Sequence, residues 1–175
     1  MSPRLFSVFD VTRQVFIQNR LSFGIVGLKP IVPGHVLVIP NRVVPRVADL
    51  SPEELGDLFC TVQQVGNVVQ KAFKGEALTI ACQNSSTKDG PAAGQSVPHV
   101  HFHILPRRFT DFGGNNDQVY PILEEAEGRM QDQLHSLHER TKVPERIKVD
   151  DESRTPRTEE EMEKEAAWLR TFFSE

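Results

Sequence analysis

The chain has 175 residues, of which 38% are hydrophobic, and this size suits one compact domain. Its formal net charge is −4 and it has no basic arm or arginine-rich stripe, so we expect no nucleic-acid partner. No apolar run approaches the ~18 residues of a membrane span, and we therefore expect no membrane partner.

Short runs rich in Phe, Val and Ile open the chain at residues 5–17 and 21–26, and they predict strands. Residues 29–35 form a turn-rich connector, and residues 35–41 predict a further strand that Pro40 closes. The hairpin-like spacing of these runs favours antiparallel pairing over a parallel, doubly wound sheet.

A long helix is predicted from residue 51 onward. Ser51 is a capping residue, Pro52 suits the first helical position, and Glu54 stands where a capping box places an acid. Apolar residues then recur at helical spacing until Gly75 ends the run, and we interpret this stripe as core without chemistry. The stripe consists of Leu55, Leu58, Phe59, Val62, Val65, Val69 and Phe73.

Two more strands are predicted over residues 77–83 and 97–105, with a loop of small and polar residues between them. Residues 124–156 are charged and show little periodicity, which predicts a linker or insert. A capped terminal helix follows, with an apolar stripe of Met162, Ala166, Leu169 and Phe173.

The order of elements predicts the α+β class: a mostly antiparallel sheet of about five strands, one long helix and a C-terminal helix. We divide the chain into a main domain over residues 1–123, the linker or insert over 124–156, and a terminal helix over 157–175 that belongs to the same domain. Residues 1–123 carry 11 basic and 9 acidic side chains, whereas the acids gather in the remainder. A small anionic ligand in the main domain fits this distribution, and a solvated acidic tail fits it equally well.

Three histidines, His99, His101 and His103, alternate with apolar residues shortly before Pro106. Successive side chains of a strand point to opposite faces, so the three imidazoles would share one face, roughly 6–7 Å apart, while Val100, Phe102 and Ile104 enter the core.

Residues 94–97 lie immediately before this row, namely Gly94, Gln95, Ser96 and Val97. A glycine-containing loop that enters a strand can direct backbone N–H groups and a hydroxyl toward one anion. An imidazole is nucleophilic when it is neutral, and its phosphorylated form is labile. The combination predicts chemistry at phosphorus.

Three other interpretations stay open at this point. Three histidines and a water are the ligands of many catalytic zinc sites, although the loop would then have no role and no acid is an obvious partner to orient them. A second interpretation is that the histidines only fill a solvent-facing surface of the sheet. A third is that the chain binds nucleotides without turnover.

The row of histidines resembles the motif of the histidine triad superfamily of nucleotide hydrolases and transferases, in which three histidines alternate with apolar residues. Nearly the whole chain, except about residues 126–153, is similar to its fragile histidine triad branch, which cleaves diadenosine triphosphate to AMP and ADP. The segments that carry this resemblance are residues 21–23, 29–38, 57–59, 89–97, 105–108, 111–112 and 159–170, with Tyr120.

The resemblance implies a role for each matching residue. His101 would be the nucleophile that forms a covalent AMP–histidine, and His103 would stabilise charge on the phosphate or the bridging oxygen. His99 would orient the site, and His35 would support the catalytic histidines without contacting the substrate. Gln83 would contact phosphates near the leaving group.

It also implies that Gly94, Gln95, Ser96 and Val97 form the phosphate-binding loop, with Ser96 near the departing oxygen. Gly27 stands where the family usually has an asparagine that helps to hold the nucleoside, and Val8 or its neighbours stand where the family has a histidine. We expect an apolar base pocket that Leu28, Phe6 and Phe9 help to line.

The implied ligands are a dinucleoside polyphosphate or nucleotide and a divalent cation, Mg²⁺ or Mn²⁺, that is bound with the substrate. We expect no protein metal site and no organic cofactor. The resemblance also implies a homodimer, and we expect a cytoplasmic location, with the nucleus as the alternative and an organellar presequence disfavoured. Alternative activities are a nucleoside phosphoramidase, a dinucleoside polyphosphate phosphorylase and a signalling module with slow turnover.

Overall fold

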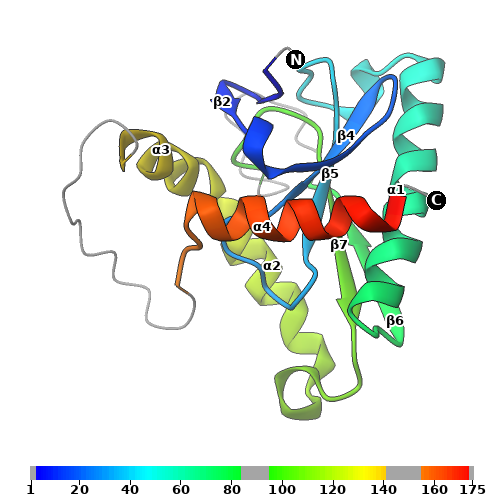
Figure 1. The fold of residues 1–175 in the computed structure, drawn as a ribbon, viewed down its shortest axis with the longest axis vertical. Coiled ribbons are helices and arrows are strands. Elements are labelled where there is room, and N and C mark those ends of the chain that lie inside the picture. Colours follow the sequence, from blue (N-terminus) through cyan, green and yellow to red (C-terminus); the bar gives the residue numbers. More distant parts are fainter. Residues whose placement is uncertain (1–2, 84–94, 141–154, 174–175) are drawn as a thin grey trace.

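The computed structural model describes residues 3–83, 95–140 and 155–173 (Figure 1). Over these residues the chain forms a five-stranded antiparallel sheet and a separate two-stranded hairpin beside helices, so the predicted α+β class is confirmed. The sheet order is β3 (Val15–Gln18), β4 (Ser22–Val26), β5 (Val36–Pro40), β7 (Phe102–Arg107) and β6 (Ala77–Ala81), and the hairpin pairs β1 (Leu5–Phe6) with β2 (Phe9–Asp10). None of the described helices is long and apolar enough to span a membrane.

One face of the sheet packs on α1 (Pro52–Ala72) and α4 (Glu159–Arg170), which runs across the sheet in Figure 1. Val36 and Val38 of β5 belong to this core, whereas Leu37 between them belongs to the core on the other face. The period of two that the sequence shows along the strand therefore separates two apolar layers.

The capping box that the sequence predicts for α1 is present. The Ser51 backbone N–H donates to the Glu54 carboxylate at 2.8 Å, and the Glu54 N–H donates to the Ser51 hydroxyl at 3.2 Å. Thr158 and Glu161 form the same motif at the start of α4. In the helix interiors the buried apolar residues face the sheet, as the spacing predicts: Leu58, Val62, Val65, Val69, Met162, Ala166 and Leu169. The prediction is wrong for Phe59, which is 49% exposed.

The other face of the sheet is covered by α2 (Val119–Gly128), α3 (Met130–Arg140) and the N-terminal hairpin. The prediction of a linker over 124–156 is wrong for residues 124–128 and 130–140, which are helical. Val119 and Leu123 are buried against Ile31 and Leu105, so a short apolar stripe holds α2 on the sheet, while Glu124 and Glu125 are exposed. Residues 141–154 lie outside the described residues.

Several strand boundaries also differ from the prediction, and the strand expected over 77–83 ends at Ala81. The run at 5–17 is divided into β1, β2, a 3-10 turn (Thr12–Gln14) and β3. The strand expected over 97–105 begins only at Phe102, because residues 97–99 bend, and it extends to Arg107 through Pro106. The bend brings the backbone before β7 close to the histidine side chains.

Candidate active site

His99, His101 and His103 are completely buried, on the side of the sheet that α2, α3 and the hairpin cover. Their apolar neighbours enter the core beneath α1 and α4, as the alternation predicts: Val100, Phe102 and Ile104. Because none of the three imidazoles has exposed area, the idea that they only fill a solvent-facing surface is wrong.

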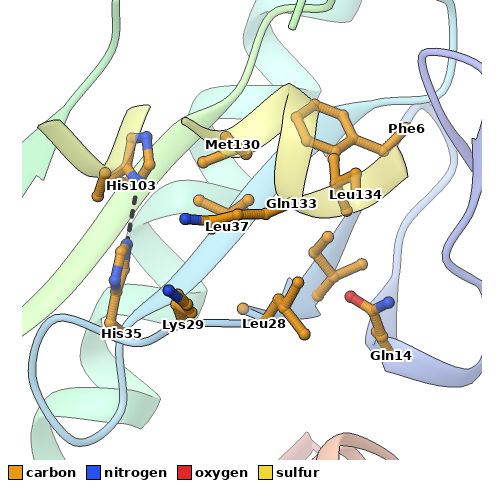
Figure 2. A pocket seen from close by; sticks show the side chains of 13 residues that line it. Phe6, Gln14, Leu28, Lys29, His35, Leu37, His103, Met130, Gln133 and Leu134 are labelled. Atoms are coloured by element: carbon orange, nitrogen blue, oxygen red, sulfur yellow. Dashed lines mark hydrogen bonds between the residues drawn. The ribbon is translucent and has the colours of Figure 1, made fainter. Parts of the chain in front are cut away.

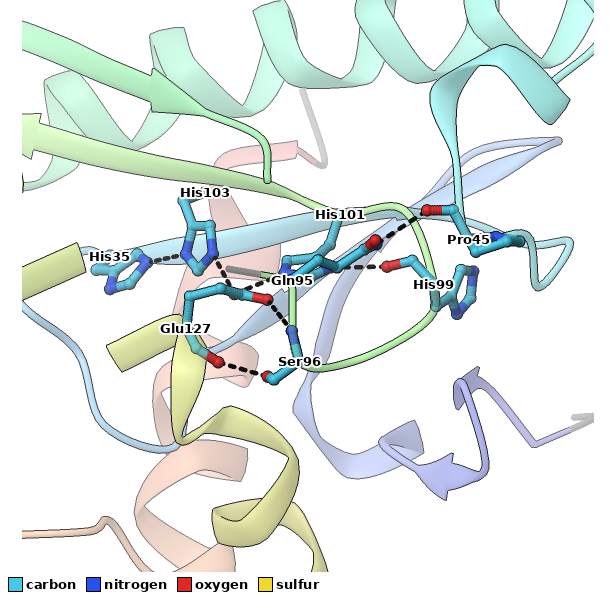
Figure 3. Close-up of polar contacts among 8 residues, drawn as sticks. All are labelled: His35, Pro45, Gln95, Ser96, His99, His101, His103 and Glu127. Carbon is cyan, nitrogen blue, oxygen red and sulfur yellow. Dashed lines mark hydrogen bonds and ion pairs between the residues drawn. The ribbon is translucent and has the colours of Figure 1, made fainter. Parts of the chain in front are cut away.

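The ring of His101 is oriented by the backbone of the preceding histidine. Its Nδ1 atom lies 2.7 Å from the carbonyl oxygen of His99 (Figure 3). A carbonyl oxygen can only accept, so the proton of the neutral ring lies on Nδ1 and the lone pair lies on Nε2. The geometry therefore places the Nε2 atom of this ring on the side of His103 and Glu127.

His35 fixes the tautomer of His103 in the same way. The backbone N–H of Ile31 donates to His35 Nδ1 at 3.1 Å, which leaves the ring proton of His35 on Nε2. That Nε2–H donates to His103 Nδ1 at 2.9 Å. His103 consequently presents an N–H donor from its own Nε2 atom, and burial, which lowers the pKa of this ring, keeps it neutral.

His99 does not line the cavity, and both of its ring nitrogens bind backbone groups. Its Nδ1 accepts from the Ser7 backbone N–H at 2.9 Å, and its Nε2–H donates to the Pro40 carbonyl at 2.9 Å. Burial lowers its pKa to about 4, so the ring is neutral. With both ring nitrogens engaged, His99 cannot join His101 and His103 on one ion, and the three-histidine zinc interpretation fails.

The structure adds an acid that the sequence analysis missed. Glu127, near the end of α2, is completely buried, and its Oε2 atom lies 2.9 Å from His101 Nε2 and 3.0 Å from His103 Nε2. The Ser96 N–H donates to Oε1 at 3.2 Å, and the Ser96 hydroxyl donates to the Glu127 carbonyl. The apolar spacing of Val119, Leu123 and Ala126 was the available signal for the helix that delivers this carboxylate.

His101 and Glu127 are the oppositely charged side chains of this cluster. Burial alone would lower the pKa of His101, but the facing carboxylate raises it above its ordinary value. Burial alone would raise the pKa of Glu127, but the two imidazoles hold it well below its usual range. The arrangement is therefore a buried ion pair of imidazolium and carboxylate.

The remaining predicted phosphate contacts lie on two segments. Gln95 donates from its side chain to the Pro45 carbonyl at 3.0 Å, Ser96 contacts Glu127 as above, and Val97 is buried. Gly94 lies outside the described residues. Gln83 follows β6, and its buried Oε1 atom has no hydrogen-bond partner among the described residues. Continuing the register of Ala81 with His103 would set Gln83 beside His101.

A cavity of about 40 Å³ lies next to His103 and contains the predicted base-pocket residues Gly27, Leu28 and Phe6 in its wall (Figure 2). Phe9, in contrast, packs its ring on His135. Val8 is 74% exposed and is not among the residues that line the cavity.

The loop that carries Gly27 is anchored from the C-terminal segment. The Arg157 guanidinium donates to the Gly27 carbonyl from Nε at 3.0 Å and from a terminal nitrogen at 2.5 Å. The Arg157 backbone N–H donates to the Leu28 carbonyl at 3.0 Å. A segment far along the chain therefore sets the position of one wall of the cavity.

Comparison with known proteins places these features in a family context. A family model described as HIT domain matches residues 9–110. A bis(5'-nucleosyl)-tetraphosphatase [asymmetrical] of Schizosaccharomyces pombe is 50% identical over 97% of this chain and 94% of its own length. A bis(5'-adenosyl)-triphosphatase of Dictyostelium discoideum is 42% identical over 93% and 87%. The crystal structure of the C. elegans NitFhit protein aligns with a TM-score of 0.65 at 31% identity, over 97% of this chain and 30% of that one.

Proposed function

This chain belongs to the HIT domain family, and from that premise we propose that it hydrolyses dinucleoside polyphosphates, cleaving diadenosine triphosphate to AMP and ADP through a nucleotidyl-histidine. The observation that carries the proposal is the orientation of His101, whose Nδ1–H is held by the His99 carbonyl so that Nε2 faces the site. An imidazole held in this way is ready to act as a nucleophile once Nε2 is unprotonated.

The proposed reaction has two displacements at one phosphorus atom. First, the Nε2 lone pair of His101 bonds to the α-phosphorus while the bond to the bridging oxygen breaks, and ADP leaves with the bonding electrons. A water oxygen then bonds to the same phosphorus, the nitrogen–phosphorus bond breaks, and AMP departs as one proton passes to solvent. The Nδ1–H of His101 stays on the His99 carbonyl throughout.

Donors around His101 would bind the non-bridging oxygens of that phosphate. His103 offers its Nε2–H, which the relay from His35 keeps in place, and Ser96 offers its backbone N–H and hydroxyl. Donors that are positioned before the reaction stabilise the charge of the transition state without reorganisation. The phosphate-binding role assigned to Gln95 and Val97 belongs to the same proposal.

Attack at the α-phosphorus gives unequal products for any phosphate chain length. A triphosphate bridge releases ADP, and a tetraphosphate bridge releases ATP, with AMP in both cases. The names of the two curated relatives, an asymmetrical tetraphosphatase and a triphosphatase, are compatible with one such site. Product analysis with both substrates separates hydrolysis from the rival phosphorylase and phosphoramidase activities.

We expect the substrate to enter as its Mg²⁺ or Mn²⁺ complex. The described groups that converge at the site are two imidazoles and one carboxylate, His101, His103 and Glu127. Mg²⁺ prefers an octahedron of oxygen ligands, so the polyphosphate suits this ion better than these side chains do. The cation would neutralise charge on the leaving group.

The direct test of the covalent step is trapping by a rapid quench into base, because the nitrogen–phosphorus bond of a nucleotidyl-histidine hydrolyses in acid. The protein is mixed with diadenosine triphosphate for milliseconds, quenched, digested and analysed by mass spectrometry. The proposal expects AMP on the peptide that contains His101, at a level that follows turnover. Cleavage at the normal rate with no nucleotide on that peptide overturns the covalent mechanism.

A homodimer forms the last part of this proposal. Leu58 of α1 and Leu169 of α4 are fully buried within the chain, whereas Phe59 and Trp168 are 49% and 43% exposed and could meet a second copy. Light scattering after gel filtration tests this, with an expected mass of twice the 19.7 kDa of one chain.

A further inference from the structure

The reactive atoms of the proposed site are inaccessible in this structure. His101, His103 and Glu127 all have 0% exposed area. A phosphate ester must come within bonding distance of His101 Nε2, and the last turn of α2 lies in that position (Figure 3). An opening step must therefore precede any reaction with a nucleotide.

The Glu127 carboxylate occupies the contacts that a phosphate would make. It lies on His101 Nε2 and His103 Nε2 through one oxygen and on the Ser96 N–H through the other. These are the nucleophile and two of the donors assigned to the non-bridging oxygens. A carboxylate and a phosphate share negative charge and acceptor oxygens, so one can replace the other on the same donors.

The same contact also removes the nucleophile. A carboxylate oxygen accepts hydrogen bonds, so the distance of 2.9 Å requires a proton on His101 Nε2. Nδ1 already carries a proton that it donates to the His99 carbonyl. The ring is then an imidazolium without a lone pair for phosphorus.

The nucleoside cavity is closed by the helix that follows. Met130, Gln133 and Leu134 of α3 lie over it, opposite Leu37 of the sheet (Figure 2). Its volume of about 40 Å³ is far below the ~300–1,000 Å³ typical of ligand pockets. A nucleoside enters only if α3 moves away from the sheet.

We propose that α2 and α3 form an autoinhibitory lid, in which Glu127 acts as an internal stand-in for the α-phosphate of the substrate that this chain is proposed to cleave. The substrate must displace the Glu127 carboxylate from His101 and lift α3 from the base cavity. Opening also frees one proton from His101, so nucleotide binding and proton release are linked.

One ion pair accounts for the linkage between nucleotide binding and proton release. The titratable groups that face His101 are Glu127 on α2, His103 on β7, His99 beside it and Cys82 after β6. His99 and His103 are neutral, and burial together with the Glu127 charge raises the pKa of the Cys82 thiol to about 11. Among the described residues that face His101, the pair of His101 and Glu127 alone is left to change its charge near neutral pH.

The test removes the carboxylate by Glu127→Gln and Glu127→Ala. Glu124→Gln is the matched control, because Glu124 is an exposed acid on the same helix. A competent state populated at 10% or less weakens apparent affinity about tenfold or more. We therefore expect both Glu127 variants to raise kcat/KM for diadenosine triphosphate, and the affinity for AMP, at least about tenfold, with the control unchanged.

Calorimetry in two buffers of different ionisation heat measures the proton. Wild type should release up to about one proton per AMP at pH values above about 6.5 and below the raised pKa of His101 in the closed form, and Glu127→Gln should release far less. Hydrogen exchange in wild type should become faster over residues 119–134 when AMP binds, a readout that needs no variant. The lid is overturned if wild type and Glu127→Gln release equal numbers of protons and AMP leaves hydrogen exchange over residues 119–134 unchanged. It is also overturned by a folded Glu127→Ala variant whose kcat/KM is unchanged or lower and whose AMP affinity is unchanged.

These readouts separate the lid from the proposed activity. If wild type binds AMP with release of a proton and faster exchange but cleaves no dinucleoside polyphosphate, the lid stands and the proposed reaction fails. If cleavage proceeds through an AMP–histidine while the Glu127 variants match wild type in both AMP affinity and proton release, the reaction stands and the lid is overturned.

Discussion

The Nε2 atom of His35 lies 2.9 Å from the Nδ1 atom of His103, and this contact decides where the protons of the site lie. Because Ile31 donates to the other nitrogen of His35, the chain of donors runs in one direction, from the backbone into the site. His103 is thereby kept as a donor at Nε2. A metal ion would need a lone pair at that atom, so the relay works against coordination by His103.

Replacing His35 by Phe should therefore change both catalysis and the response to metal. We expect kcat to fall roughly tenfold, less than the ~10²–10³ for loss of an oxyanion donor, because His103 itself remains. Without the relay His103 can present its lone pair, so Zn²⁺ should inhibit the variant at lower concentration than wild type. Steady-state assays with a zinc titration measure both effects, and equal zinc sensitivity of the two proteins would refute the relay.

The variant His101→Asn tests the nucleophile. It keeps a polar side chain of similar shape but removes the atom that would bond to phosphorus. We expect turnover to fall by at least ~10³, whereas AMP and a non-hydrolysable substrate analogue should still bind. Turnover within tenfold of wild type would rule out His101 in this role.

Local signals in the sequence were sufficient for much of the fold. The capping box of Ser51 and Glu54 involves residues three positions apart, and the α1 stripe follows from helical period alone. The alternation of histidines with apolar residues likewise predicted that the two kinds of side chain lie on opposite sides of the sheet. Each of these features depends on neighbours along the chain.

The position of Glu127 in the site cannot be predicted from residues near it along the chain. It lies 24 residues beyond His103 along the chain, and only the packing of α2 against residues such as Ile31 and Leu105 brings the two together. The α2 stripe is short, spanning residues 119–126, so it offers little periodicity to detect in the sequence. The site's charge pattern therefore required the tertiary structure, although the choice of His101 as the proposed nucleophile did not.

The pair of His101 and Glu127 predicts how activity depends on pH. The pKa of His101 is raised from its ordinary value of 6.5 in the closed form. A raised pKa stabilises that form fully below the ordinary value, and this stabilisation is lost as pH rises through the raised value. The kcat/KM of wild type should thus increase with pH from about 6.5 upward, and in Glu127→Gln the increase should occur at lower pH. Identical profiles for the two proteins over about pH 5 to 9 would contradict this.

The contact of Arg157 with Gly27, which anchors one wall of the cavity, predicts an effect on KM and little effect on kcat. Arg157 is 16% exposed, donates twice to the Gly27 carbonyl and pairs with Glu165. A lysine keeps the charge but cannot make the two directed hydrogen bonds. For Arg157→Lys we expect KM for diadenosine triphosphate to rise about three- to tenfold with kcat within about twofold, because the wall that holds the nucleoside shifts while His101 stays in place.

The matched control is Arg13→Lys, since Arg13 is 54% exposed and pairs with Glu159 and Glu163 of α4. Exposed pairs contribute ~0–1 kcal/mol, so this change should leave KM unchanged and alter the free energy of unfolding little. Arg157→Lys should lower the free energy of unfolding by ~1–3 kcal/mol in urea, because the part-buried carbonyl of Gly27 loses its donors. A fall in kcat with unchanged KM would instead show that Arg157 acts on the chemical step and not on the nucleoside wall.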